Sequence, residues 1–425
     1  MKKYINPSKS LWPEMLSRPV LDNTSLKERV AEVLKEIKAG GDEAVKKYTE
    51  KFDGVVLESF LVTQDEIKLA VAEISKDLKD AIELAAKNIR LFHEKQTAKV
   101  EIVETQPGIK CWRKSVGIEK VGLYIPGGSA PLFSTILMLG IPAQIAGCKE
   151  ILLCSPPNKE GKLHPAILFA AQLVGVTRIY KIGGVQAIGA MAYGTGTVPK
   201  VYKIFGPGNQ FVTCAKQMVQ EDGLAIDMPA GPSEVCVLAD DSAIPAFVAS
   251  DLLSQAEHGA DSQAILITTA QSILQKVEAE LEKQLALLPR KAIAEKALAN
   301  SKLILVPSIE EAIEIANEYA SEHLILACEN AEEVAEKIVN AGSIFIGNYS
   351  PESVGDYASG TNHTLPTNGY ARAYSGVSVD SFIKKITYQK LTQQGLQLIA
   401  SPVILMAEAE GLRAHANAVN IRLNA

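Results

Sequence analysis

Cysteine is scarce in this chain. Only 6 of its 425 residues are cysteine, they form no Cys-x-x-Cys pair, and their spacing is not that of a disulfide framework. This excludes small disulfide-stapled secreted proteins and cysteine-based zinc modules, and it fits a reducing, cytoplasmic environment.

Long apolar runs and excess positive charge are also missing. The most apolar stretch, residues 132–147, is interrupted by polar residues and Pro142, so it is too short and too polar to cross a bilayer. The first residues carry two lysines without an apolar segment behind them, so no signal peptide is expected. With a net charge of −6 and only short basic pairs, nucleic acid is not an expected partner. We therefore expect a cytoplasmic protein that binds neither membranes nor nucleic acid.

The sequence does contain a regular alternation of apolar strands and helices. Residues 1–25 form a proline-interrupted arm, and helical patterns cover 25–51 and 65–95. A first series of strands is expected at 117–125, 150–154, 178–181 and 201–205. A second series is expected at 234–239, 263–268, 302–306, 323–327 and 343–346. Such alternation predicts parallel sheets covered by helices on both faces.

The predicted fold class is α/β, with two doubly wound, Rossmann-like parallel-sheet units, an N-terminal arm and a C-terminal helical extension. We expect four parts: the arm at 1–25, a discontinuous α/β domain from 26–115 with 234–376, an inserted α/β domain at 116–233, and a helical segment at 377–425. Residues 347–377 lack any periodicity, and loops of that length are usually functional. The final helix is expected to start at Ser401-Pro402 and run towards Asn420.

Residues 254–263, SQAEHGADSQ, close one helix and open the next strand. The helix is expected to begin at Ser242 as N-cap, with Pro245 in its first turn. Gln255 and His258 are three residues apart and would share one face at its end, before Gly259 lets the chain leave. The pair can be a local hydrogen-bonded cap, which is the commoner case, or part of a metal site.

A dinucleotide fingerprint was sought and is absent, because residues 194–199 carry proline where the third glycine belongs. Three other turns follow strands and precede helices, at 125–129, 183–186 and 206–209. Their N–H groups could face a phosphate, or they could be ordinary tight turns. Glu322 and His323 lie at a helix-to-strand junction, where they could form an ion pair or an acid–base pair.

Four segments taken together carry a resemblance: residues 227–235 (DMPAGPSEV), 254–263, 322–326 (EHLIL) and 350–367 (SPESVGDYASGTNHTLPT). The set resembles the histidinol dehydrogenase family, from about residue 110 to the last helix. The resemblance implies NAD-dependent oxidation of L-histidinol to L-histidine through L-histidinaldehyde, the last two steps of histidine biosynthesis. In that reaction His323 would be the base for the alcohol and Glu322 would activate water for the aldehyde step.

The resemblance also assigns binding residues. Zn²⁺, one per subunit, would be held by Gln255, His258, Asp356 and His415. NAD would be contacted by Tyr124, Gln186 and Asn209. The substrate would be contacted by Ser233, Gln255, His258, His323, Asp356, Glu410 and His415. Residues 116–233 would thus be the NAD side and the discontinuous domain the substrate and metal side.

The family further implies a homodimer in which residues 377–425 cross to the partner and donate Glu410 and His415 to a shared site. On their own, Asp356 could cap a turn and His415 could be a polar residue on a helix face. On one continuous helix, Glu410 and His415 would point about 140° apart. His363 is expected to be a structural hydrogen-bonding residue.

Three alternatives remain beside this reading. One is a related NAD- and Zn-dependent dehydrogenase of another amino alcohol or diol, one is a zinc hydrolase without NAD, and one is a non-catalytic binding protein. No thiol is expected to take part in catalysis, because no cysteine adjoins a motif of catalytic character.

Overall fold

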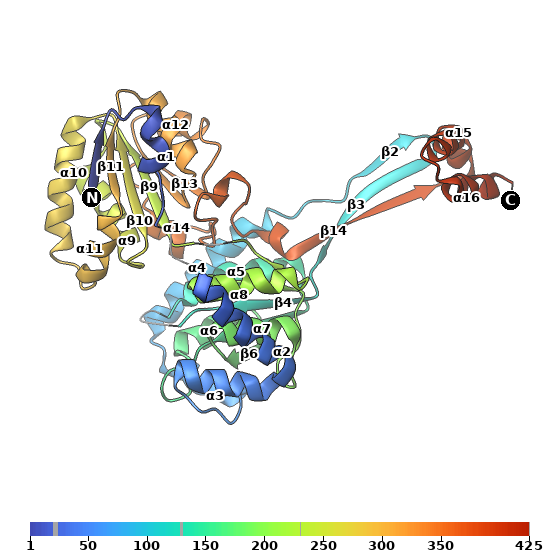
Figure 1. Cartoon of the computed structure of the whole chain (residues 1–425), viewed down its shortest axis with the longest axis horizontal. Helices are drawn as coiled ribbons and strands as arrows, with labels where there is room; N and C mark the ends of the chain where they lie inside the picture. The colour runs from blue at the N-terminus through green and yellow to red at the C-terminus, as the bar shows by residue number, and fades with distance from the viewer. Residues whose placement is uncertain (20–23, 128–130, 230, 425) are drawn as a thin grey trace.

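The computed structural model describes residues 1–19, 24–127, 131–229 and 231–424. Its described strands form three sheets, which divide the molecule into unit A, unit B and a projecting arm (Figure 1). Units A and B each contain a parallel sheet covered by helices, so the predicted fold class is confirmed. No helix in these ranges is long and apolar enough to cross a membrane.

Unit A contains a six-stranded sheet of order β1-β11-β10-β9-β12-β13, in which all neighbouring strands are parallel. Its three central strands, β9, β10 and β12, are buried at every residue, as expected of strands covered on both faces. The strands are β1 (Lys2–Ile5), β9 (Glu234–Ala239), β10 (Gln263–Thr268), β11 (Lys302–Leu305), β12 (His323–Ala327) and β13 (Ser343–Ile346). The covering helices are α1 (Trp12–Met15), α9 (Pro245–Ala256), α10 (Gln271–Leu285), α11 (Lys291–Ala299), α12 (Ile309–Tyr319) and α13 (Ala331–Ala335).

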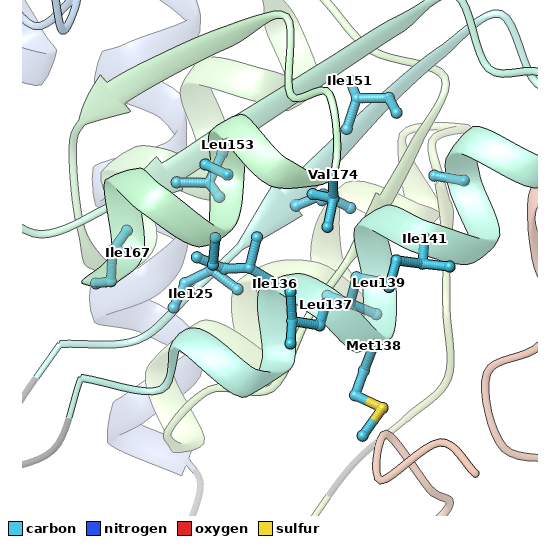
Figure 2. Packing of buried hydrophobic residues seen from close by; sticks show 14 of the residues in the cluster. Ile125, Ile136, Leu137, Met138, Leu139, Ile141, Ile151, Leu153, Ile167 and Val174 are labelled. Atoms are coloured by element: carbon cyan, nitrogen blue, oxygen red, sulfur yellow. The ribbon is translucent and has the colours of Figure 1, made fainter. Parts of the chain in front are cut away.

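Unit B contains a five-stranded parallel sheet of order β6-β5-β4-β7-β8. Its strands are β4 (Lys120–Tyr124), β5 (Glu150–Ser155), β6 (Arg178–Lys181), β7 (Lys203–Phe205) and β8 (Ala225–Ile226). One face is covered by α3 (Gln64–Glu73), α4 (Lys76–Glu94), α5 (Phe133–Ala146) and α6 (Pro165–Leu173). The other face is covered by α2 (Thr24–Asp53), α7 (Gly184–Tyr193) and α8 (Gln210–Glu221). Figure 2 shows the aliphatic core between α5, α6 and the sheet, including Ile125, Ile136 and Leu153.

The packing of α2, α3 and α4 differs from the expected domain division. The sequence grouped residues 26–115 with 234–376 in unit A, whereas these three helices bury their apolar stripes on unit B. In α2 the contact is close, because Ile37 and Leu34 lie 3.0 and 3.2 Å from where a Cβ on Gly189 of α7 would be. Helical periodicity gives the face that a helix buries, but it does not say which of two sheets receives that face. The domain boundaries themselves stay a prediction, and this packing favours assigning residues 24–94 to unit B.

Both ends of the chain contain strands that the sequence did not predict. β1 pairs in parallel with β11, so the N-terminal arm begins as an edge strand. The projecting arm is an antiparallel sheet of β2 (Ile102–Gln106), β3 (Ile109–Gly117) and β14 (Ile383–Leu391), so the expectation that residues after 378 are wholly helical is wrong. At its tip lie α15 (Gln393–Ala409) and α16 (Arg413–Leu423) (Figure 1). Pro402 is inside α15, so the expected helix start at Ser401-Pro402 is also wrong.

The aperiodic stretch between β13 and β14 joins the two units. It contains α14 (Glu352–Tyr357) and the short 3₁₀ helices η2 (Tyr370–Arg372) and η3 (Val379–Phe382). Asn88 of α4 donates to the carbonyl of Ala358 at 2.8 Å, and Asn362 donates to the carbonyl of Met138 in α5 at 2.7 Å. The Phe382 ring stacks on Phe205 of β7 with centroids 3.9 Å apart. These contacts hold the stretch that contains α14 against unit B, while β13 connects it directly to unit A.

Candidate active site

Glu322 and His323 lie where α12 ends and β12 begins. Ala320 ends the helix in a left-handed conformation with φ of 51°, which turns the chain directly into the central strand. Both side chains then bind the main chain of Glu234, the first residue of the neighbouring strand β9. Glu322 Oε2 accepts from the Glu234 N–H at 2.9 Å, and His323 Nδ1 lies 3.2 Å from the Glu234 carbonyl oxygen, to which it can donate.

The side chain of Glu234 is held in turn by the N-terminal segment. Its carboxylate accepts hydrogen bonds from Arg18 Nη2 at 2.9 Å, from Arg18 Nε, and from the N–H of Asn368 at 2.9 Å. Arg18 Nη2 also donates to the carbonyl of Tyr319 at 2.6 Å, and its guanidinium lies 4.2 Å from the centroid of the Tyr319 ring. No local pattern in the sequence indicates this network, because residues 18, 234 and 319 come together through the tertiary fold. Arg18 therefore supports the Glu322–His323 pair without contacting either residue.

Helix α14 supplies two carboxylates to the same place. Glu352 and Asp356 are four residues apart and so share one face of this short helix. Together with His258 they offer ligand atoms that all lie within 4.8 Å of one another. His323 adjoins both, with Nε2 3.5 Å from Asp356 Oδ1 and Nδ1 3.9 Å from Glu352 Oε1. Glu352 was missed by the sequence reading; its spacing from Asp356 and the preceding Pro351 were the available signals.

Several buried polar atoms of the cluster and of Gln255 have no hydrogen-bond partner among the described residues. They are both amide atoms of Gln255, Nε2 of His323, Oε2 of Glu352 and Oδ1 of Asp356. Such atoms are rare in folded proteins, because burial without a partner is unfavourable. Their concentration here indicates a site that is completed by a bound polar group or ion.

The end of α9 differs in detail from the expectation. The helix begins at Pro245 and not next to Ser242, whose hydroxyl instead bonds Asp240, and it ends at Ala256. His258 therefore lies in the turn after the helix and not on its last face, yet it still reaches the carboxylates of α14. The Gln255 amide has no partner, so the pair is not a closed hydrogen-bonded cap.

The acids and histidines of the cluster alter one another's protonation. Burial raises the pKa of Glu322 to about 7 and that of Glu352 to about 8. Burial disfavours the charged imidazole of His323, but the surrounding carboxylates outweigh this and raise its pKa well above the usual value. Burial also opposes the charge of Asp356, yet the adjacent His323 lowers the net pKa of this carboxyl. Desolvation lowers the pKa of His258, which favours the neutral imidazole that binds metals.

The donor set fits a zinc ion. Imidazole and carboxylate donors are compatible with Zn²⁺, and His258, Glu352 and Asp356 provide them within one chain. Gln255 lies three residues before His258, and its buried amide has no partner among the described residues. His415 does not join them in the same chain: it lies in α16, at the tip of the projecting arm, and Glu410 ends α15 nearby (Figure 1). The expected 140° separation does not apply to this pair, because the helix breaks at Gly411, with φ of 76°, between them.

A cavity of about 1180 Å³ opens at the carboxyl ends of the unit B strands, and Tyr124, Gln186 and Asn209 all line it. Tyr124 is the last residue of β4, and its hydroxyl accepts a hydrogen bond from the N–H of Gly184 at 3.1 Å. Asn209 caps α8 by accepting from the N–H groups of Phe211 and Val212. The turns after three different strands thus converge on one space, as the parallel sheet requires. Of the expected turn at 125–129, Gly128 and Ser129 lie outside the described residues.

Two further predicted residues lie beside the cluster. Ser233 immediately precedes β9 and is the neighbour of Glu234. His363 places Nδ1 2.8 Å from the carbonyl oxygen of Asp356 and Nε2 3.1 Å from Thr135 Oγ1 at the start of α5. His363 therefore connects α14 with unit B, in agreement with a structural role.

Comparison with known proteins identifies this arrangement. The family model for histidinol dehydrogenase matches residues 16–423. The chain belongs to the histidinol dehydrogenase family. A histidinol dehydrogenase of Bacteroides thetaiotaomicron is 61% identical over 100% of this chain and 99% of its own length. One from Yersinia pestis is 52% identical over 97% of this chain and 93% of its own length. This family membership makes the chain an oxidoreductase of histidine biosynthesis.

Solved structures agree with the sequence comparison. The crystal structure of histidinol dehydrogenase from Elizabethkingia anophelis matches with a TM-score of 0.98 at 58% identity, covering 100% of this chain and 98% of that one. An acetylating aldehyde dehydrogenase from Geobacillus thermoglucosidasius matches with a TM-score of 0.50 at 19% identity, covering 87% and 98% of the two chains. The second match concerns the fold alone.

Proposed function

We propose that the protein oxidises L-histidinol to L-histidine through L-histidinaldehyde, reducing two NAD⁺ per turnover with one Zn²⁺ per subunit. The observation that carries the proposal is the meeting of Glu322 and His323 with a cluster of unpartnered metal-binding side chains in a member of the histidinol dehydrogenase family. When bound, NAD⁺ would accept hydride, and zinc would fix the substrate through its imidazole and amine nitrogens.

His323 is the base in the first oxidation. The carboxylates raise the pKa of His323, and the charge of a bound zinc ion would offset them so that the ring is neutral. Its Nδ1 proton is then directed at the carbonyl oxygen of Glu234, which leaves Nε2 as the free ring nitrogen. Nε2 takes the proton of the substrate hydroxyl while a hydride leaves the carbon atom that bears this hydroxyl, so the alcohol becomes an aldehyde.

Glu322 serves the second oxidation. The aldehyde must first add water, and a carboxylate with a pKa near neutrality is suited to take a proton from that water. The resulting hydrate then loses its second hydride and becomes the carboxylate product. The main-chain N–H of Glu234 orients Glu322 Oε2 for this role.

Four of the six cysteines are poorly suited to the alternative route through a thiohemiacetal. Burial raises the pKa of Cys148 to about 12 and that of Cys328 to about 11, and it raises the pKa of Cys154 and Cys236 further. Such thiols form little of the thiolate that attacks an aldehyde. This supports the prediction that no thiol participates.

The metal site is completed across a homodimer. Gln255, His258 and Asp356 would come from one chain and His415 from the other, with Ser233 and the other chain's Glu410 contacting the substrate. Two exposed apolar surfaces support this. Leu405 and Met406 of α15 are 63% and 65% exposed, although the helix buries only small residues of its own chain. Around α14, Tyr349, Val354 and Tyr357 are also exposed. A second copy that covers both surfaces would bring α15 and α16 to the cluster.

The decisive experiment is the ratio of NADH formed to histidinol consumed, with two expected. A ratio of one, or faster turnover of another amino alcohol or of a diol, would favour the related dehydrogenase instead. Chelation should remove activity, and Zn²⁺ should restore it.

Sharing of the site can be tested by mixing two inactive variants. His258→Ala and His415→Ala alter different halves of the proposed site, so a mixed dimer has one intact site. Activity should therefore return after the two are unfolded and refolded together. If no activity returns while mixed dimers form, each site lies within one chain and the proposed sharing is wrong.

A further inference from the structure

Asp53 ends helix α2 and lines the cavity that contains Tyr124, Gln186 and Asn209. Its Oδ2 accepts a hydrogen bond from Nε2 of Gln186 at 3.0 Å. Among the described residues, the Asp53 carboxylate accepts no other side-chain hydrogen bond. The nearby Lys159 donates to the main-chain oxygen of Asp53, at 2.9 Å, and not to its side chain. A partly buried carboxylate with one neutral partner therefore faces an open space.

The fold itself gains little from this carboxylate. Helix C-termini carry a partial negative charge, so an acidic side chain is unfavourable there. Burial adds to this and raises the pKa of Asp53 to about 6. Asp53 is thus placed where its charge weakens the folded state, which is typical of a group retained for binding.

Asp53 also orients Gln186. Because the amide nitrogen of Gln186 donates to Asp53, its oxygen Oε1 is left as a buried acceptor with no partner in the described part of the chain. A carboxylate oxygen and an amide oxygen then stand side by side as acceptors. The complementary ligand carries two adjacent hydrogen-bond donors, and in a dinucleotide the vicinal hydroxyl groups of a ribose have this property.

The position within the sheet indicates which ribose. Asp53 Oδ1 lies 3.2 Å from where a Cβ on Gly183 would be, in the turn that follows the edge strand β6. The catalytic cluster adjoins the other side, since His363 connects Asp356 with Thr135 at the start of α5, which follows β4. β6 and β4 are separated by β5, or roughly 10 Å. The reacting ring therefore belongs towards β4, and the far, adenosine end belongs at Asp53.

We propose that Asp53 and Gln186 form the subsite for the vicinal hydroxyl groups of the adenosine ribose, and that Asp53 excludes a phosphate at the 2′ position. The inference rests on the proposed use of NAD. A 2′-phosphate would place its negative charge against the carboxylate and would lose the hydroxyl donor, so the site selects NAD⁺ over NADP⁺.

The test compares Asp53→Asn with the native enzyme, using the full-length holoenzyme. Binding of NAD⁺ and NADP⁺ is measured by calorimetry, and kcat and KM for both are measured with saturating histidinol. We expect the NAD⁺ affinity of the variant to fall about tenfold, the loss of one charge-assisted hydrogen bond, with kcat nearly unchanged. The affinity for NADP⁺ should fall less or should rise, so the ratio of the two affinities that favours NAD⁺ becomes smaller. Glu50→Gln, which removes a carboxylate from the exposed face of the same helix turn, should change neither affinity.

Two further measurements separate binding from structure. NAD⁺ lacking the 2′-hydroxyl should bind the native enzyme weakly and should show little additional loss with Asp53→Asn. The melting temperature of the variant should be equal or higher, because an unfavourable charge has been removed. A lower melting temperature with equal losses for both cofactors would make Asp53 a structural residue and overturn the proposal.

The remaining outcomes also decide. If NAD⁺ affinity falls while the NAD⁺/NADP⁺ preference stays constant, the hydroxyl groups belong to the other ribose and the assignment is wrong. If neither affinity changes, there is no subsite at Asp53. If the native enzyme forms no NADH from histidinol, the proposed function fails, whereas calorimetry with NAD⁺ still tests the subsite.

Discussion

Arg18→Met should destabilise the protein far more than a surface substitution does. The Glu234 side chain is 3% exposed. The substitution removes the two hydrogen bonds that its carboxylate accepts from the Arg18 guanidinium and leaves the one from the Asn368 N–H. Removing one partner of a buried ion pair costs about 3–5 kcal/mol, because the other charge stays buried without compensation. Arg18 also bonds the Tyr319 carbonyl and covers its ring, and these contacts are lost as well.

The assay is urea unfolding at pH 7 together with steady-state turnover. Turnover should fall even under conditions where the variant is folded, because the main chain of Glu234 holds both Glu322 and His323. Arg18→Met combined with Glu234→Gln should recover much of the stability, since a neutral amide needs no counterion. Lys9→Met breaks an exposed ion pair between the same segment and Glu314, and should change unfolding by less than about 1 kcal/mol. An Arg18→Met loss as small as that, with normal turnover, would refute the reasoning.

Three further predictions follow from the sites. Glu322→Gln should retain much of the oxidation of histidinol and stall with histidinaldehyde, so separate assays of the two substrates would show unequal losses; equal losses would contradict the division of roles. Glu352→Gln should weaken Zn²⁺ binding about 10-fold or more when measured by competition with a chelator, because a bound cation would ionise the Glu352 carboxyl and the amide cannot supply that charge; unchanged affinity would exclude Glu352 from the metal site. Asp53→Asn should stabilise the protein at pH 8 but not at pH 4. The pKa of Asp53 in the folded protein is about 6, above the usual 3.8, so the native protein loses stability as the pH rises from 3.8 to 6. The amide of the variant does not ionise, so the variant does not lose this stability. Equal effects on the urea midpoint at both pH values would contradict the last of these.

The two parallel sheets could be predicted because their strands are buried. Continuous apolar runs placed β9, β10, β12 and β13 at the residues where the structure has them. The projecting sheet could not be found in this way. β14 has mostly exposed, lysine-containing residues and, among the described strands, pairs with β3 alone, so its sequence carries no burial pattern to read. Its partner strand is also more than 250 residues away along the chain, as the pairing of Ile383 with Gly117 shows.

The site could be predicted only for residues in or aligned by the segments that resemble the histidinol dehydrogenase family. The roles of Glu322, His323, Gln255, His258 and Asp356 came from the resemblance, and the structure brings His258 together with Asp356 and Asp356 together with His323. Arg18, Glu352 and Asp53 were missed for a common physical reason. Each acts through a partner from a distant element, and an isolated arginine, glutamate or aspartate in the sequence is most often a solvated residue.

The proposed dimer links stability to catalysis in a way that dilution can expose. Within one chain, Leu405 and Met406 of α15 are exposed to water. Among the described residues, the Gln255 amide and one carboxylate oxygen each of Glu352 and Asp356 have no hydrogen-bond partner. One association would remove both deficits, since the helices that need cover carry Glu410 and His415. Activity per chain and melting temperature should therefore fall together as the enzyme is diluted below the dissociation constant of the dimer. Because Leu405→Glu places a charge in the contact and touches no ligand, it should raise the concentration at which both losses occur. Full activity of a monomer, established by sedimentation at the assay concentration, would show that the site is complete in one chain.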